Sequence, residues 1–142
     1  MSLVFWDTML FVYLLEDHPL FAGRVKEIRS RMIDRGDQLC TSAFTLGELL
    51  SGPSARNDAH IAGRYRAAIR SPYVQVLSFT EQTAEHFASI RANRSVAPAD
   101  AIQLACAAEA KVDLFLTNDR HLSKRLVVRG IQFIGDLDFD YL

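Results

Sequence analysis

Hydrophobic residues recur along the chain with two spacings, one typical of buried strands and one typical of amphipathic helices. Short apolar or alternating runs predict strands at positions 3–6, 38–41, 73–77, 114–117 and 132–134. Between them, apolar residues three or four positions apart predict helices at 9–16, 20–34, 42–53, 57–70, 80–93, 99–111 and 121–129. Strands that alternate with helices in this way predict an α/β sandwich around a mainly parallel sheet.

Several of these predicted helices carry residues that usually start or stop a helix. Ser42 is suited to cap a helix N-terminus, and Pro98 fits a first helical turn. Gly36 is a plausible stop for the helix before it. The pair Gly52-Pro53 is expected to end the helix that begins at Ser42.

The composition indicates one globular domain, which we take to span residues 1–142. Hydrophobic residues make up 49% of the chain and charged residues 23%, and no run of Ser, Gly or Pro suggests a linker. Cys40 and Cys106 lie in apolar stretches and are expected to be buried thiols, which suits a reducing cytoplasm. The apolar segment 3–15 is too short for a membrane span and is interrupted at Asp7. We therefore expect a soluble cytoplasmic protein with no membrane partner.

The net charge of −1 does not by itself indicate a nucleic-acid partner. The sum hides a split, because four of the 17 acidic residues are candidates for one functional site. Without those four, 13 acidic residues face 16 basic ones, which leaves +3. A metal-loaded acidic site on a mildly basic surface is compatible with RNA.

The four candidate acids are placed so that they can converge. Asp7 directly follows the first predicted strand, and Asp119 follows the fourth. Asp100 lies in the first turn of a predicted helix, and Glu48 lies mid-helix among apolar neighbours. In open α/β sheets, functional sites form beyond the carboxyl ends of the strands. We expect the four side chains to meet there.

Each acid, taken alone, also has a structural interpretation. Asp7 can cap the following helix, Asp100 can interact with the helix dipole, Asp119 can belong to a turn, and Glu48 can be solvated. Asp7, however, interrupts an apolar run, where a carboxylate is costly unless it is paired or metal-bound. Carboxylates held close together raise one another's pKa values, and a divalent cation removes that penalty. Mg²⁺ and Mn²⁺ prefer oxygen ligands and can activate water near a phosphodiester.

Four short segments, in their order and spacing, resemble the motifs of the PIN-domain ribonucleases, and within them the VapC-type toxins of bacterial toxin–antitoxin pairs. The segments are Val4-Phe5-Trp6-Asp7-Thr8, Gly47-Glu48-Leu49-Leu50, Pro98-Ala99-Asp100-Ala101 and Leu116-Thr117-Asn118-Asp119. The resemblance covers nearly the whole chain. It implies a three-layer α/β/α sandwich and an endoribonuclease that depends on Mg²⁺ or Mn²⁺.

The same resemblance implies roles for individual residues. The catalytic and metal-binding acids would be Asp7, Glu48, Asp100 and Asp119, of which Asp7 and Asp100 are the strongest candidate metal ligands. Thr8 and Thr117 would orient carboxylates, and Asn118 and Arg120 would approach the phosphate backbone. Met9 departs from the family pattern, since many members have a small polar residue there. Any hydrogen bond from that position is therefore in question.

The resemblance also implies a homodimer and a cognate antitoxin protein. Such antitoxins often place a helix in a hydrophobic groove of the toxin. Phe11, Tyr13 and Phe21 are candidates to line such a groove, and a place in the core suits them equally well.

Alternatives remain open at this stage. The domain could keep the fold and bind RNA or protein without catalysis. A receiver-like domain with Asp7 as phospho-acceptor would need a lysine after a late strand, where Asn118 stands. The arginines at positions 64, 66, 70, 91 and 94 could form a solvated face or contact phosphates. We expect His121 to be a surface residue, with proton transfer as the alternative, and the acidic C-terminal residues 136, 138 and 140 to form a solvated tail.

Overall fold

A five-stranded sheet forms the centre of the protein. The computed structural model describes residues 1–140, with the backbone alone at positions 124 and 125. The strands are β1 (Leu3–Trp6), β2 (Gln38–Ser42), β3 (Val74–Leu77), β4 (Leu114–Leu116) and β5 (Phe133–Gly135). They lie in the order β3-β2-β1-β4-β5, and every neighbouring pair is parallel. The predicted parallel sheet is thereby confirmed, and β1 is its central strand.

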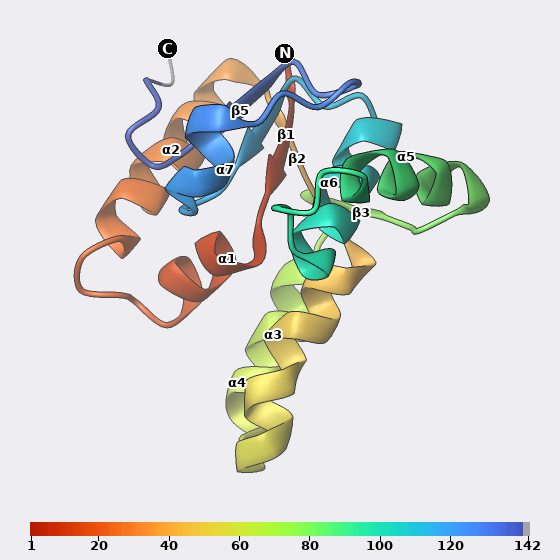
Figure 1. The fold of residues 1–142 in the computed structure, drawn as a ribbon. Coiled ribbons are helices and arrows are strands. Elements are labelled where there is room, and N and C mark those ends of the chain that lie inside the picture. The colour runs from red at the N-terminus through yellow and green to blue at the C-terminus, as the bar shows by residue number, and fades with distance from the viewer. Residues whose placement is uncertain (141–142) are drawn as a thin grey trace.

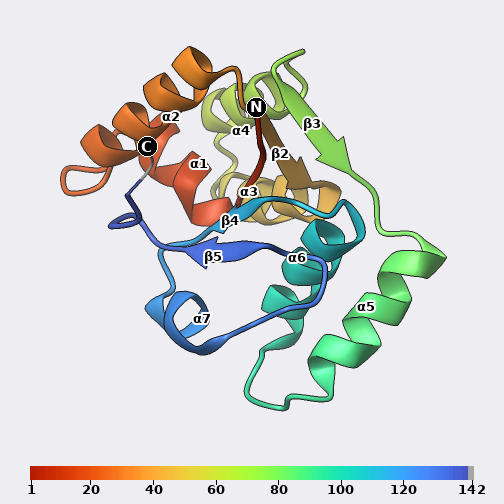
Figure 2. The same cartoon turned by 90° about the horizontal axis from the view of Figure 1, so that it is seen from above.

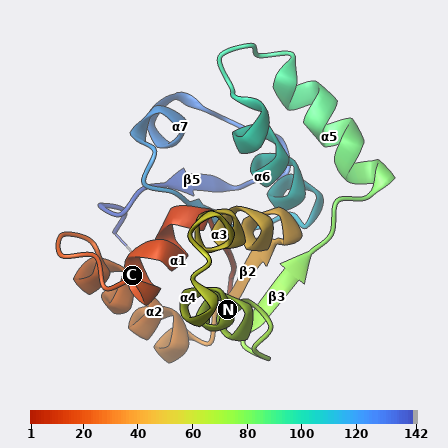
Figure 3. The ribbon, with the colours of Figure 1, turned by 90° about the horizontal axis from the view of Figure 1, so that it is seen from below.

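Helices cover both faces of this sheet (Figure 1). They are α1 (Thr8–Leu15), α2 (Ala22–Arg35), α3 (Ala43–Arg56), α4 (Ala59–Ile69), α5 (Glu81–Arg91), α6 (Pro98–Glu109) and α7 (Arg120–Arg125). Helices α1 to α4 lie on one side and α5 to α7 on the other, as the views along the vertical axis show (Figure 2; Figure 3). This arrangement is the predicted three-layer α/β/α sandwich.

The core is divided by the sheet because successive strand residues point to opposite faces. Val4 and Trp6 pack beneath the first helical layer, whereas Phe5 faces the second layer. Phe5 stacks on Phe115 of β4 with ring centroids 4.9 Å apart. The two cysteines are buried and unbridged, as expected. Burial raises the pKa of the Cys40 thiol to about 12 and that of Cys106 to about 11.

The helix ends follow the sequence signals at some positions and not at others. Gly36 ends α2 with a left-handed φ of 71°, and the Ser42 side chain caps α3, as predicted. The predicted end of α3 at Gly52-Pro53 is wrong, since α3 continues to Arg56. Pro53 is buried within the helix, and its carbonyl accepts the N–H of Asp58. Packing along α4 therefore outweighs the hydrogen bond that proline cannot make.

Helices α3 and α4 form a hairpin that projects away from the rest of the molecule (Figure 1). Phe11 and Tyr13, the candidates for a groove, are instead buried in the core beneath the first helical layer, and Phe21 is half-buried against it. Their alternative interpretation as core residues is therefore the better one. None of the helices in the described part of the chain has the length and apolar character that crossing a membrane requires.

Candidate active site

The four candidate acids line one cavity at the carboxyl ends of the strands. The cavity has a volume of about 330 Å³. Its lining also includes the predicted residues Thr8, Thr117 and Asn118, together with Met9, Tyr13, Ala99 and Gln103. The structure therefore brings together seven of the eight predicted site residues, and Arg120 is the exception.

Asp7 lies where β1 passes into α1, and both of its carboxylate oxygens accept hydrogen bonds. Oδ1 accepts the backbone N–H of Thr8 at 2.9 Å, so Asp7 also caps α1. Oδ2 accepts the hydroxyl of Thr117 at 2.9 Å, from the end of β4. Burial raises the pKa of Asp7, and the repulsion from Asp119 adds to the rise, whereas these hydrogen bonds oppose it.

Asp100 enters the cavity from the first turn of α6, on the other side of the sheet. Burial raises the pKa of its carboxyl group to about 6, and the charges of Asp7, Asp119 and Glu48 contribute to the rise. All three neighbours therefore act on Asp100 electrostatically, although they come from different elements. This shared negative field is the property that attracts a cation.

Glu48 projects from the second turn of α3 and is held by two neighbours. Its Oε1 accepts the hydroxyl of Thr8 at 2.6 Å. The side-chain amide of Gln103 lies 3.5 Å from the same oxygen. Thr8 thus contacts Glu48, and Thr117 contacts Asp7, so each of the two predicted orienting hydroxyls touches a carboxylate.

Gln103 is a site residue that the sequence reasoning missed. It lies one turn after Asp100 on α6 and is 2% exposed. Its amide also contacts the hydroxyls of Ser42, Thr45 and Thr8. A signal was present, because Gln103 interrupts an otherwise apolar helical segment just as Asp7 interrupts the first apolar run.

Asp119 and its successors lie at the open rim of the cavity. Asp119 is exposed, and its Oδ1 accepts the backbone N–H of His121 at the start of α7. Asn118 donates to the hydroxyl of Tyr13 at 2.9 Å. Arg120 does not line the cavity, and its guanidinium is paired with Asp138 at 2.7 Å. The predicted approach of Arg120 to a substrate would require it to leave this partner.

Asp138 and Asp140 are exposed, as predicted for a solvated tail, but contacts also anchor the C-terminal segment. Asp136 accepts the hydroxyl of Ser123 at 3.2 Å, and Asp138 pairs with Arg120. The backbone carbonyl of Leu137 accepts Nε of Arg24 at 2.6 Å. Side-chain and backbone contacts therefore fix this segment against α2 and α7, an arrangement that local sequence spacing does not encode.

The donor set fits a divalent cation that keeps part of its water shell. Within residues 1–140 no three His, Cys, Asp or Glu side chains are arranged to hold an ion directly among them. The four carboxylates that line the cavity offer oxygen ligands, and burial together with repulsion between the acids raises the pKa values of Asp7 and Asp100. Mg²⁺ commonly binds through one or two carboxylates plus several waters. The cavity therefore suits Mg²⁺ or Mn²⁺ better than it suits a fully dehydrated ion.

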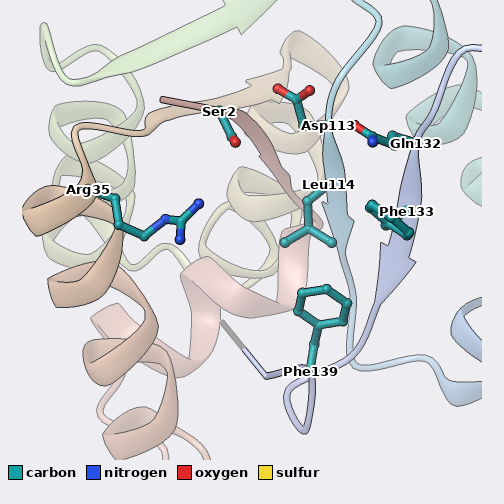
Figure 4. Close-up of a pocket in the computed structure, with 7 residues that line it drawn as sticks. All are labelled: Ser2, Arg35, Asp113, Leu114, Gln132, Phe133 and Phe139. Atoms are coloured by element: carbon teal, nitrogen blue, oxygen red, sulfur yellow. The ribbon is translucent and has the colours of Figure 1, made fainter. Parts of the chain in front are cut away.

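A second cavity, of about 260 Å³, lies at the opposite edge of the sheet (Figure 4). Its lining includes Ser2, Leu114, Phe133 and Phe139, beside Asp113. Asp113 accepts the backbone N–H of Leu3 at 2.7 Å. This cavity contains no group of facing carboxylates, so it is not the predicted acidic site.

Comparison with known proteins agrees with this geometry. The family model described as "PIN domain" matches residues 4–125. Among curated proteins, none matches the chain.

Three solved structures share the fold at low sequence identity. VapBC2 from Rickettsia felis, bound to a promoter DNA fragment, has a TM-score of 0.70 at 13% identity, over 94% of this chain and 98% of that chain. DNA-bound VapBC from Salmonella typhimurium has a TM-score of 0.69 at 23% identity, over 96% of this chain and 99% of that chain. A VapC toxin of Mycobacterium tuberculosis that cleaves the sarcin–ricin loop has a TM-score of 0.68 at 19% identity, over 89% of this chain and 98% of that chain.

Proposed function

This chain belongs to the PIN-domain family, and from that premise we propose that it is a Mg²⁺- or Mn²⁺-dependent endoribonuclease, the toxin of a toxin–antitoxin pair. The observation that carries the proposal is the convergence of four carboxylates from β1, α3, α6 and the β4–α7 junction on one cavity. The similar fold of a toxin that cleaves the sarcin–ricin loop supports RNA as the substrate class.

The proposed roles follow from what each residue touches. Asp7 and Asp100 are the first candidates to hold the cation, because both are partly buried and have raised pKa values. Glu48 and Asp119 would complete the site directly or through water. Thr117 fixes the orientation of Asp7, and Thr8 fixes that of Glu48. Asn118 and Arg120, at the rim, would contact the phosphate backbone.

A divalent cation in such a site neutralises charge on the phosphodiester and lowers the pKa of a bound water. The protein supplies the negative field that retains the cation, and it holds the carboxylates by hydroxyl and backbone donors. Those neutral donors orient Asp7 without cancelling its charge. In the described residues, no lysine or arginine forms an ion pair with any of the four acids. The site therefore keeps its charge for a cation.

The proposal extends to partners. Structures of VapB–VapC complexes share this fold, which supports a cognate antitoxin, and the family resemblance supports a homodimer and a cytoplasmic location. Light scattering on the purified protein tests the dimer directly. A protein that is monomeric at micromolar concentration would remove that part of the proposal and leave the nuclease untouched.

The nuclease is tested by incubating the protein with total cellular RNA in Mg²⁺, in Mn²⁺ and in EDTA. The Asp7→Asn variant serves as control, and the cut ends are mapped. We expect discrete cuts that require both metal and Asp7. If folded protein free of any antitoxin binds RNA but never cuts it under either metal, the alternative of a non-catalytic binding module replaces the proposal.

A further inference from the structure

The side chain of Gln103 occupies a buried position between the two helical layers. It comes from α6, which also carries Asp100, yet its contacts lie on α1, on α3 and at the end of β2. Residues three apart on a helix share a face. Asp100 and Gln103 therefore both face the cavity, Asp100 at its open part and Gln103 at its buried wall.

Both N–H groups and the carbonyl oxygen of the Gln103 amide are engaged in hydrogen bonds. Oε1 accepts the hydroxyl of Ser42. Nε2 donates to the hydroxyl of Thr45 at 2.7 Å and to that of Thr8 at 3.1 Å. An uncharged amide has two N–H donors and one carbonyl acceptor, so these three partners account for both N–H groups and the carbonyl.

The direction of each hydrogen bond follows from counting protons. Thr8 has one hydroxyl proton and gives it to Glu48, so Thr8 can only accept from Gln103. Thr41 likewise gives its proton to the carbonyl of Trp6, the residue before Asp7, and can then accept from Thr45. Two chains of hydrogen bonds thus leave one amide, one ending at the Glu48 carboxylate and the other at the backbone beside Asp7.

We propose that Gln103 is a positioning residue that fixes Glu48 and the backbone before Asp7 relative to Asp100, so that the acids bind a divalent cation. The proposal rests on the proposed metal-dependent function and adds a residue to which nothing else assigns a role. A neutral amide suits the task, because lysine or arginine at this position would cancel the negative charge. A carboxylate would lack the donors and repel Glu48.

The test is the affinity for Mn²⁺ of the metal-free protein, measured by titration calorimetry and by the electron paramagnetic resonance of free Mn²⁺. Gln103→Met keeps the size of the side chain and removes every hydrogen bond of the amide. We expect it to bind Mn²⁺ about 10- to 100-fold more weakly, the range seen when partners of metal ligands are lost. Gln103→Met leaves the four acidic residues themselves in place.

Thr83→Val is the matched control. Thr83 is also fully buried and hydrogen-bonded, but it forms the capping box of α5 with Thr80, away from the acidic cavity. This variant should lose stability to urea while its affinity for Mn²⁺ stays unchanged. If Gln103→Met does not fold, Ser42→Ala takes its place. It removes the hydrogen bond to Oε1, the cap of α3 and a 3.5 Å contact with the Thr45 hydroxyl, and should weaken Mn²⁺ binding severalfold.

The outcomes separate the two proposals. Wild-type affinity in a folded Gln103→Met protein, or in Ser42→Ala where that variant takes its place, overturns the positioning role and leaves the nuclease standing. Equal losses of Mn²⁺ affinity in Gln103→Met and Thr83→Val also overturn it, because they would reflect general destabilisation. If the wild-type protein itself binds no Mn²⁺, the proposed metal-dependent function fails together with the inference.

Discussion

At the amino ends of the strands, Asp37 and Asp113 are matched by donors, whereas the carboxylates at the carboxyl ends face one another across a cavity. Asp37 accepts the backbone N–H of Ser2 at 2.7 Å and pairs with Arg35 at 3.0 Å. At the other edge, the charges of Asp7, Asp119 and Glu48 all raise the pKa of Asp100. Aspartates at the amino ends of the strands thus stabilise the fold, whereas those at the carboxyl ends gather negative charge.

This difference teaches how to separate a structural acid from a candidate functional one. Burial alone does not do so, since the side chain of Asp37 is 0% exposed and Asp100 is only partly buried. The partners make the distinction. Asp37 is paired with a guanidinium and a backbone N–H, whereas Asp100 is surrounded by three other acids. Acids left without compensation raise the energy of the folded state, which is typical of sites kept for function.

The largest expected effect is on catalysis, and only substitutions at the carboxyl ends of the strands should cause it. Asp100→Asn should lower kcat/KM for RNA on the order of a thousandfold or more, about 4 kcal/mol in the barrier. Asp37→Ala should leave kcat within error of wild type. Single-turnover cleavage of an end-labelled RNA measures both. Comparable losses in the two variants would erase the functional distinction between the edges.

The second expected effect is on the free energy of unfolding, which should fall for a substitution at the amino ends and rise for one at the carboxyl ends. Asp37→Ala removes the acceptor of the part-buried Ser2 N–H and the ion pair with Arg35, and should cost about 1–3 kcal/mol of unfolding free energy. Asp100→Asn removes the cost of burying a charged carboxylate and the repulsion from the other acids. It should raise the stability of the metal-free protein by about 1 kcal/mol at pH 7, after allowance for solvent screening. Urea unfolding in EDTA measures both, and a destabilised Asp100→Asn protein would contradict the interpretation.

The pH dependence of that gain follows from the direction of the pKa shift. The pKa of Asp100 is raised from 3.8 to about 6, so the folded chain holds the proton more tightly than the unfolded chain. In the wild-type protein, the stabilising contribution of protonated Asp100 is full below pH 3.8 and is lost as pH rises through about 6. The advantage of Asp100→Asn should therefore vanish near pH 4, and saturating Mn²⁺ should reverse it at pH 7 by binding only the wild-type site.

The smallest expected effect concerns the rim. Arg120 and Asp138 are both well exposed, so breaking their ion pair should change stability by less than about 1 kcal/mol. If Arg120 leaves Asp138 to contact RNA, Arg120→Ala should raise KM severalfold without changing kcat, and Asp138→Ala should lower KM slightly. Steady-state kinetics at two salt concentrations separates these outcomes, and an unchanged KM in both variants would remove Arg120 from the substrate contacts.

The sequence predicts much of the fold because the relevant signals are local. Apolar strand runs, Gly36 and the Ser42 cap act within a few residues, and the acids following two strands converge because parallel strands end together. The prediction fails where distant packing decides. Pro53 stays inside α3 because α4 lies against it, and Arg120 turns to Asp138, 18 positions away.

The hydrogen-bond network of Gln103 likewise depends on residues that are distant in the sequence. Its partners Ser42, Thr45 and Thr8 lie 61, 58 and 95 positions away in the chain. A buried glutamine in an apolar helix indicates that some partner exists, because a buried amide needs one. Nothing in the spacing identifies which hydroxyls those are, so only the assembled layers reveal the connection to Glu48.

The placement of β1 at the centre of the sheet has a consequence for the timing of synthesis. Asp7 is made before the residue that orients it, because the hydroxyl of Thr117 lies 110 positions later, and Asp119 follows still later. At about 5–20 residues per second, this delay lasts roughly 6–22 seconds. A nascent chain on the ribosome therefore carries an incomplete acidic site throughout that interval, and the proposed cleavage of RNA has to await Thr117 and Asp119, which follow β4.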